Sequence, residues 1–194
     1  MEKKMELQQL FQTYRETFSE EPAFVWGDGN INANVLLIGE APGKDEVKQG
    51  RPFVGKAGQN LNVFLESIGL ERSDLYITNV IKYRLSKIHP VRGTESNRPA
   101  STTEILNSIP FLHREIEIVK PRVIVTLGNV PLRAVKNDIS AQTTIGMFHG
   151  EMHKMPISGE FYQVYPLYHP ASIIYNRSLE AVYLEDLKRL AKFL

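Results

Sequence analysis

Short runs of apolar residues alternate along the chain with segments in which apolar residues recur every three or four positions. The short runs are typical of strands buried on both faces of a sheet, and they cover residues 34–38, 74–78, 122–127 and 163–167. The helical spacing predicts helices over residues 4–17, 57–69, 101–120 and 179–194, with a short one after Asn129. A capping box at Ser101 opens the third helix, and Pro110 is expected to kink or divide it.

The alternation of strands and helices predicts an α/β fold with a parallel sheet that helices cover on both sides. Without an internal repeat or a low-complexity linker, residues 1–194 are expected to form one domain. Ligands of such open sheets bind beyond the carboxyl ends of the strands. The polar residues at those ends are Glu40, Asn79 and His169, so the sequence predicts a functional site there.

The composition is that of an ordinary soluble globular protein. The 194 residues include no cysteine, which excludes disulfides and thiolate-bound metals, and the formal net charge is +1. With no apolar N-terminal leader and no long apolar run, we expect a cytoplasmic protein that does not enter a membrane. A nucleic-acid-binding surface, if present, has to be local.

One segment offers such a local surface. Between Ile81 and Arg98 only Glu95 opposes five cations, which are Lys82, Arg84, Lys87, Arg92 and Arg98. Charge alone is equally compatible with a solvated loop that has no partner.

Two glycine-rich loops follow the first strand. The run GEAPGKDE over residues 39–46 forms a tight turn whose N–H groups can face an anion, with Glu40, Asp45 and Glu46 beside it. The run GRPFVGKA over residues 50–57 resembles a phosphate loop. However, Ala57 replaces the hydroxyl that would hold magnesium, so we reject a nucleotide-binding role. The aromatic ring of Phe53 is suited to stack on a base, or to ordinary packing.

The asparagine and the histidine are each compatible with base recognition, although a lone asparagine at the end of a strand is more often a turn or cap residue and a single histidine is more often structural. The amide of Asn79 both donates and accepts, as the O4 and N3–H edge of uracil requires, whereas cytosine reverses part of that pattern. His169 precedes a proline at the ligand face and is suited to donate to an oxygen that gains negative charge. His149 and His153 have metal-ligand spacing only in a helix, which Gly150 disfavours, so no metal or other cofactor is predicted.

Taken together, four motifs resemble those of the family 4 uracil-DNA glycosylases. These are GEAPG at residues 39–43, GRPFVGKAG at 50–58, YITNV at 76–80 and YHPA at 168–171. The resemblance runs from about Phe24 to Arg177 and includes PRVIVTLG at 121–128. It implies a three-layer α/β/α sandwich around a four-stranded parallel sheet, and a monofunctional DNA repair enzyme whose partner is uracil-containing DNA. We expect the protein to be a monomer.

The resemblance also implies roles for single residues. Phe53 would stack on the flipped uracil, Asn79 would read its edge, and His169 would donate to O2, assisted by backbone N–H groups near Ala41. Glu40 would orient water or stabilise the sugar cation, while Asp45 and Glu46 remain candidates to activate water or to shield C5. The implied DNA contacts are Lys82, Arg84, Ser172 and Ile173, the last within an apolar wedge over residues 172–175.

The chain departs from that family in one large respect. Typical members hold an iron–sulfur cluster with four cysteines, and here Tyr83 and Pro110 stand near two of those positions. We expect packing to replace the cluster and the stretch 85–101 to take over its DNA-facing role. Three alternatives stay open: a weakly catalytic binding module, excision of other deaminated bases, and a crosslinking enzyme that uses His89.

Overall fold

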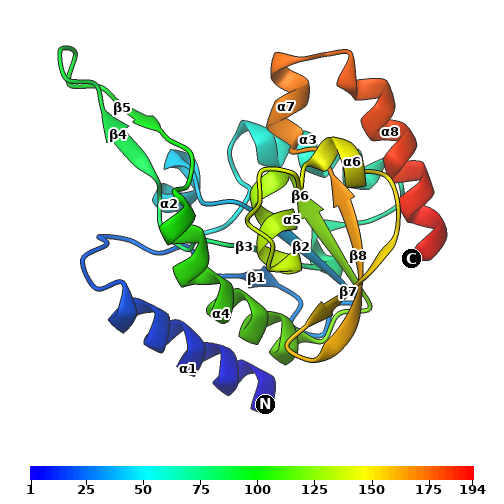
Figure 1. The fold of residues 1–194 in the computed structure, drawn as a ribbon, viewed down its shortest axis with the longest axis horizontal. Coiled ribbons are helices and arrows are strands. Elements are labelled where there is room, and N and C mark those ends of the chain that lie inside the picture. Colours follow the sequence, from blue (N-terminus) through cyan, green and yellow to red (C-terminus); the bar gives the residue numbers. More distant parts are fainter.

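The central sheet contains the four predicted parallel strands (Figure 1). The computed structural model describes residues 1–194, and in it these strands lie in the order β3, β2, β6, β8. Their bounds are Leu75–Asn79, Val35–Gly39, Val123–Leu127 and Glu160–Leu167. Every residue of β2, β3 and β6 is buried, which confirms that helices cover both faces of the sheet.

Two antiparallel edge strands extend the sheet to six strands, so the prediction of a four-stranded sheet was incomplete. β1 (Asp28–Gly29) pairs with β3, and β7 (His153–Ile157) pairs with β8. A two-residue turn joins β7 to β8, with left-handed φ values of 49° at Ser158 and 90° at Gly159. Pro156 obscured β7 in the sequence, because proline is tolerated in a strand only at an edge or a bulge.

Helices cover the two faces of the sheet and confirm the three-layer α/β/α sandwich. On one face α1, α4 and α5 pack over the side chains of Leu36 and Ile38, and on the other α3, α7 and α8 pack over Val35 and Leu37. The bounds of these helices, in chain order, are Glu2–Thr17, Lys56–Glu66, Thr102–Val119, Asn129–Lys136, Pro170–Tyr175 and Leu179–Leu190.

Helix α4 is continuous, so the expectation that Pro110 divides it was wrong. Pro110 lies on the exposed side of α4, where water can satisfy the carbonyl group that loses its N–H partner. The capping box at Ser101 is present, with the Ser101 hydroxyl accepting from the Glu104 N–H. None of the helices combines the length and the apolar character needed to span a bilayer.

The remaining elements are short. Two helices, α2 (Lys44–Gln49) and α6 (Ile145–Phe148), lie in connections between larger elements, and two 3₁₀ turns cover Arg72–Asp74 and Ala191–Phe193. Strands β4 (Ser86–Ile88) and β5 (Glu95–Asn97) form a hairpin in the stretch that the sequence suggested was irregular. This hairpin arm, residues 86–97, projects from the body of the protein (Figure 1).

An aromatic cluster fastens α1 to α4 and to the chain beside β3. The ring of Tyr14 packs 4.9 Å from that of Phe111, and the ring of Phe18 packs 5.5 Å from that of Tyr83. Phe24 and Trp26 stack on each other at 5.1 Å beside them. Such contacts add to the stabilisation that burial of the rings provides.

Candidate active site

The three polar residues predicted at the carboxyl ends of the strands lie at the same edge of the sheet. Glu40 follows β2, Asn79 ends β3 and His169 follows β8, and the Cα atoms of Asn79 and Gly39 are register partners. A cavity of about 310 Å³ opens at this edge, lined by Glu40, Ala41, Pro42, Leu85, Asn97, Arg98, Pro99 and His169. A second cavity of about 320 Å³ lies at the opposite ends of the strands, where open sheets do not place their ligands.

His169 is held in one tautomer by the helix that follows it. Its Nδ1 atom accepts a hydrogen bond of 3.1 Å from the backbone N–H of Ala171 and thereby caps α7. Because Nδ1 is an acceptor, the neutral ring carries its proton on Nε2. Burial lowers the pKa of His169 to about 4, and the Glu46 carboxylate offsets part of that shift. His169 is therefore a neutral hydrogen-bond donor at physiological pH.

Glu40 lines the same cavity as His169 with one oxygen already fixed. Its Oε1 atom accepts a hydrogen bond of 3.0 Å from the backbone N–H of Ala100, the residue before the N-cap of α4. This contact orients the carboxylate and leaves Oε2 without a partner in the protein. The role of Ala100 could not be foreseen, because sixty residues separate it from Glu40 in the sequence.

Phe53 adopts a backbone conformation that few non-glycine residues take. Its φ is +53°, and the guanidinium of Arg72 donates to the carbonyl oxygens of Phe53 and of Pro52. A Cβ atom at Gly58 would lie 1.9 Å from the Phe53 carbonyl oxygen, so this loop requires glycine there. Strained backbone of this kind often lies at functional sites. The Phe53 ring centre lies 6.0 Å from that of His169.

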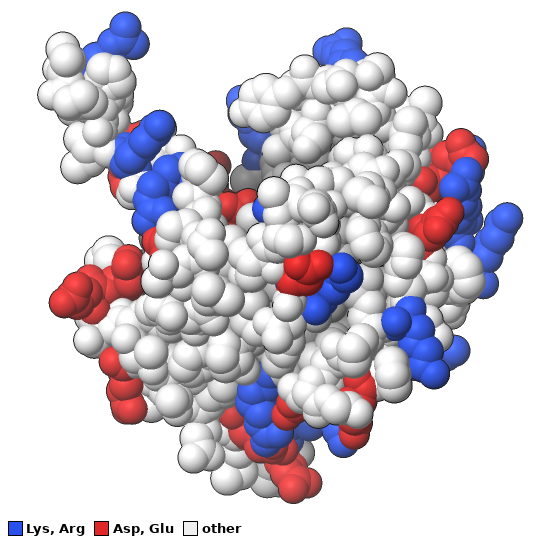
Figure 2. Space-filling view, viewed as in Figure 1, with Lys and Arg blue, Asp and Glu red and all other residues white.

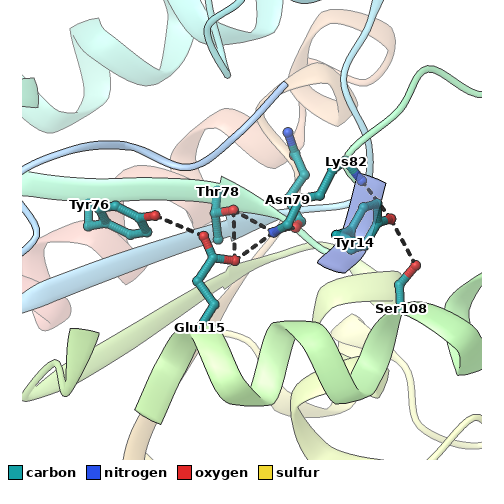
Figure 3. Close-up of polar contacts among 7 residues, drawn as sticks. All are labelled: Tyr14, Tyr76, Thr78, Asn79, Lys82, Ser108 and Glu115. Atoms are coloured by element: carbon teal, nitrogen blue, oxygen red, sulfur yellow. Dashed lines mark hydrogen bonds and ion pairs between the residues drawn. The ribbon is translucent and has the colours of Figure 1, made fainter. Parts of the chain in front are cut away.

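Gly39 allows the ring of Phe53 and the amide of Asn79 to approach each other. A Cβ atom at Gly39 would lie 2.4 Å from Phe53 Cζ and 2.4 Å from Asn79 Oδ1. Asn79 is only 2% exposed, and the hydrogen bond that it forms to Lys82 uses its backbone carbonyl oxygen and not its side-chain amide. In Figure 3 the Asn79 amide points away from the polar residues beneath it. A largely enclosed amide that no protein group occupies is suited to bind a ligand.

The two remaining acidic candidates differ in their surroundings. Glu46 Oε1 accepts from the N–H groups of Val54 and Gly55, at 3.2 and 2.9 Å, and so ties α2 to the loop that carries Phe53. Asp45 is exposed on the first turn of the same helix. Neither side chain lines the cavity that contains Glu40 and His169.

Lys82 is buried, so the prediction that it contacts DNA was wrong. It is 1% exposed, and its ammonium group donates to Glu115 Oε2 at 2.6 Å, Thr78 Oγ1 at 2.7 Å and the Asn79 carbonyl oxygen at 2.5 Å (Figure 3). Tyr76 completes this buried polar cluster by donating to Glu115 Oε1 at 2.9 Å. The cluster binds the end of β3 that carries Asn79 to helix α4.

The other residues predicted to contact DNA are paired within the protein or at least partly buried. Arg84 lies just before the hairpin arm and is paired with two of its residues, its guanidinium donating to Glu95 at 2.6 Å and to Asn97 at 3.0 Å. Ser172 is half-buried in α7. Ile173 is 6% exposed and packs in the core, so it does not face the duplex as predicted. The apolar side chains that α7 does expose are those of Ile174, at 47%, and Tyr175, at 89%.

The remaining histidines are separate from this site. His149 Nδ1 lies 2.7 Å from Asp186, and His153 Nε2 lies 3.1 Å from the Phe148 carbonyl oxygen, so they do not form a pair of metal ligands. His89 lies at the tip of the hairpin arm, where its Nδ1 accepts from the N–H groups of Val91 and Arg92. Only the base of the arm reaches the cavity.

This fold and site define a member of the uracil-DNA glycosylase superfamily. The profile of the Uracil DNA glycosylase superfamily matches residues 26–191, so the chain belongs to that family. Within it the chain is similar to the type-4 uracil-DNA glycosylases of Archaeoglobus fulgidus and Thermotoga maritima. It is 36% identical to the first over 170 residues, which are 87% of this chain and 81% of that protein. It is 34% identical to the second over 175 residues, which are 88% and 82%.

The iron–sulfur cluster of typical family 4 members does not fit this chain. No thiolate is present to ligate iron, because the sequence has no cysteine. Tyr83, near one expected ligand position, packs its ring against Phe18 and Phe24, and Pro110, near another, precedes Phe111 of the same aromatic cluster. The aromatic rings thus join α1, α4 and the segment after β3.

Proposed function

We propose that this protein removes uracil from DNA by hydrolysing the N-glycosidic bond, and that it leaves an abasic site. The observation that carries the proposal is the neutral His169, which lines the cavity, with the ring of Phe53 6.0 Å from it and the Asn79 amide next to Phe53 at Gly39. An amide that donates and accepts and a neutral donor match the O4, N3–H and O2 groups of uracil. The relatives named as uracil-DNA glycosylases support the same substrate.

In the proposed reaction, a water molecule attacks C1′ of the deoxyribose while the bond from C1′ to N1 of uracil breaks. The electron pair of that bond passes to the base, and His169 Nε2–H stabilises the charge that develops on O2. Glu40 Oε2 accepts the proton of the attacking water and stabilises the positive charge of the sugar in the transition state. The proton is then released to the departing base or to solvent.

The reaction requires that the nucleotide leave the duplex, because the base edge and C1′ are otherwise stacked out of reach. Phe53 then stacks on the extruded base. The exposed side chains of Ile174 and Tyr175 are suited to fill the gap in the duplex, which would offset an unstacking cost of a few kcal/mol. In this proposal they take the wedge role that the sequence assigned to Ile173.

The test is incubation of the protein with an oligonucleotide that contains one uracil, followed by alkali and gel electrophoresis. The proposal predicts cleavage at the uracil position and none in matched oligonucleotides that carry cytosine or thymine there. Binding of the uracil strand without an alkali-labile product would identify a binding module and contradict the proposal. Parallel substrates with hypoxanthine and xanthine define the range of bases.

A further inference from the structure

The hairpin arm, residues 86–97, carries surface features that the site chemistry does not use. Ile88 is 71% exposed and Val91 is 88% exposed, although both are large apolar residues at or near the tip of a two-stranded ribbon. The two strands contact each other and no other helix or strand extensively. An isolated two-stranded hairpin is marginally stable in water, so a partner is expected to hold it.

Two charged side chains of the arm form no ion pair within the protein, and both are positive. Among the five cations of the segment 82–98, Lys82 pairs with Glu115, Arg84 with Glu95 and Arg98 with Glu104. Lys87 and Arg92 form no ion pair and stand on the arm beside the exposed apolar side chains. The arm therefore presents cations and apolar groups together, which suits the phosphates and the grooves of a nucleic acid.

The position of the arm fits the same partner. Its last strand ends at Asn97, which lines the cavity together with Arg98, Pro99, Glu40 and His169. His169, which also lines the cavity, caps helix α7, whose exposed side chains are Ile174 and Tyr175. Figure 1 shows α7 and the arm projecting at the same end of the molecule. Figure 2 shows the arm standing clear of the body, with basic side chains on it and a hollow between it and the rest of the molecule.

We propose that the hairpin arm binds duplex DNA beside the extruded nucleotide, so that the duplex is held between the arm and α7. Lys87 and Arg92 contact phosphates, and Ile88 and Val91 enter a groove, which is wide enough for a two-stranded ribbon on the major-groove side. This inference rests on the proposed function, because the cavity at the base of the arm has to receive a nucleotide. The arm would therefore contribute to the binding of double-stranded substrate and not of single-stranded substrate.

The experiment compares the wild type with a variant in which an Asn-Gly turn replaces residues 87–96. Since Ser86 and Asn97 are register partners, a two-residue turn can join them and keep Asn97 at the cavity. Excision is measured on a uracil strand alone and on the same strand paired as U·G. We expect the ratio of duplex to single-strand kcat/KM to fall about tenfold, and thermal unfolding to show a folded variant.

A second variant isolates the charges. Each phosphate contact contributes roughly 0.9 to the slope of log Kd against log salt. The double variant Lys87→Gln with Arg92→Gln loses two such contacts, so for a uracil-free duplex its slope should be lower by about 1.8. The matched control, Lys188→Gln with Lys192→Gln, alters two exposed cations, one in the last turn of α8 and one in the 3₁₀ turn after it, and should leave the ratio and the slope unchanged.

Different failures of these experiments have different meanings. An unchanged ratio and slope, or equal losses on single-stranded and duplex substrates, would overturn the assignment of the arm to duplex DNA. A change in oligomeric state of the variants would assign the arm to self-association instead. If the wild type releases no uracil from either substrate, the proposed function fails, and the uracil-free duplex still tests the arm.

Discussion

His169 combines a lowered pKa with a fixed tautomer, and both follow from its place before α7. The Ala171 N–H occupies Nδ1, and the buried surroundings disfavour the charged ring. A charged imidazole would protonate the base more readily, but a neutral donor is sufficient where the base leaves as an anion. The sequence indicated that His169 belongs to the site, whereas its protonation state depends on burial and on the capping bond, which only the fold supplies.

The pKa of His169 predicts how the protein responds to acid. Because the folded-state pKa of about 4 lies below the ordinary value of about 6.5, the unfolded chain takes up this proton first as the pH falls. The contribution of His169 to stability is therefore complete above pH 6.5 and is lost as the pH falls towards 4. Titration of the ring by NMR should show a midpoint near 4, and a midpoint near 6.5 would contradict the assignment.

A His169→Gln variant supplies the control for this measurement. The free energy of unfolding, measured with urea, should fall between pH 6.5 and 4 by more in the wild type than in the variant, which has no imidazole at this position. Excision by the wild type should show no fall assignable to His169 between pH 8 and 5, because the ring stays neutral over that range.

We expect the side chain of Asn79 to determine the selectivity for uracil over cytosine. In Asn79→Asp the amide donor becomes an acceptor, so the side chain loses its bond to O4 of uracil and gains one from the amino group of cytosine. Single-turnover excision from matched uracil and cytosine oligonucleotides should show a selectivity ratio reduced at least about tenfold. Asn30→Asp, an exposed change at the other end of the sheet, is the control, and an equal ratio in both variants would exclude Asn79 as the reader.

At the scale of elements, β3 and α4 are joined by a buried ion pair under the site. Lys82 and Glu115 are each almost fully buried, and Thr78, Tyr76 and the Asn79 carbonyl group satisfy their remaining hydrogen-bonding capacity. Because every polar group of this pair has a partner, the pair fixes the geometry of the strand end. Its role is positional, since apolar residues of similar volume often stabilise a protein as well as a buried ion pair does. The position of the Asn79 backbone depends on this arrangement.

Breaking the pair from one side should be strongly destabilising. Lys82→Met leaves the Glu115 carboxylate buried without its cation, and we expect a loss of roughly 3–5 kcal/mol in the free energy of unfolding. Urea denaturation measures it. The exposed change Lys87→Met serves as the control and should shift the free energy by less than about 0.5 kcal/mol. A small loss in Lys82→Met would show that the lysine is not buried with Glu115.

The sequence predicted some elements well and others poorly, for identifiable reasons. Strands β2, β3 and β6 are apolar throughout because helices cover both of their faces, so their pattern was unmistakable. The strands β4, β5 and β7 expose most of their residues or contain Pro156, and exposed polar strands resemble loops. Lys82 was misassigned because a lysine in a basic segment is usually solvated, and its partner Glu115 is far away in sequence.

At the scale of the whole molecule, the topology brings together residues that are up to 129 positions apart, from Glu40 to His169, at one edge of the sheet. The rule for open parallel sheets allowed that edge to be predicted from the strands. The DNA-facing surface could not be predicted in the same way, because three of the five cations in the basic segment turned out to be paired within the protein. Two protrusions, the hairpin arm and α7, remain as its candidates.

The central claim is that the neutral His169 donor serves the departure of uracil and not the binding of DNA. The direct test is single-turnover uracil release by the wild type and by His169→Ala, with duplex affinity measured in parallel. Loss of one such donor typically slows the chemical step by about 10²–10³-fold, and we expect that loss with a Kd changed by less than about threefold. Equal rates of uracil release in the two proteins would contradict the account.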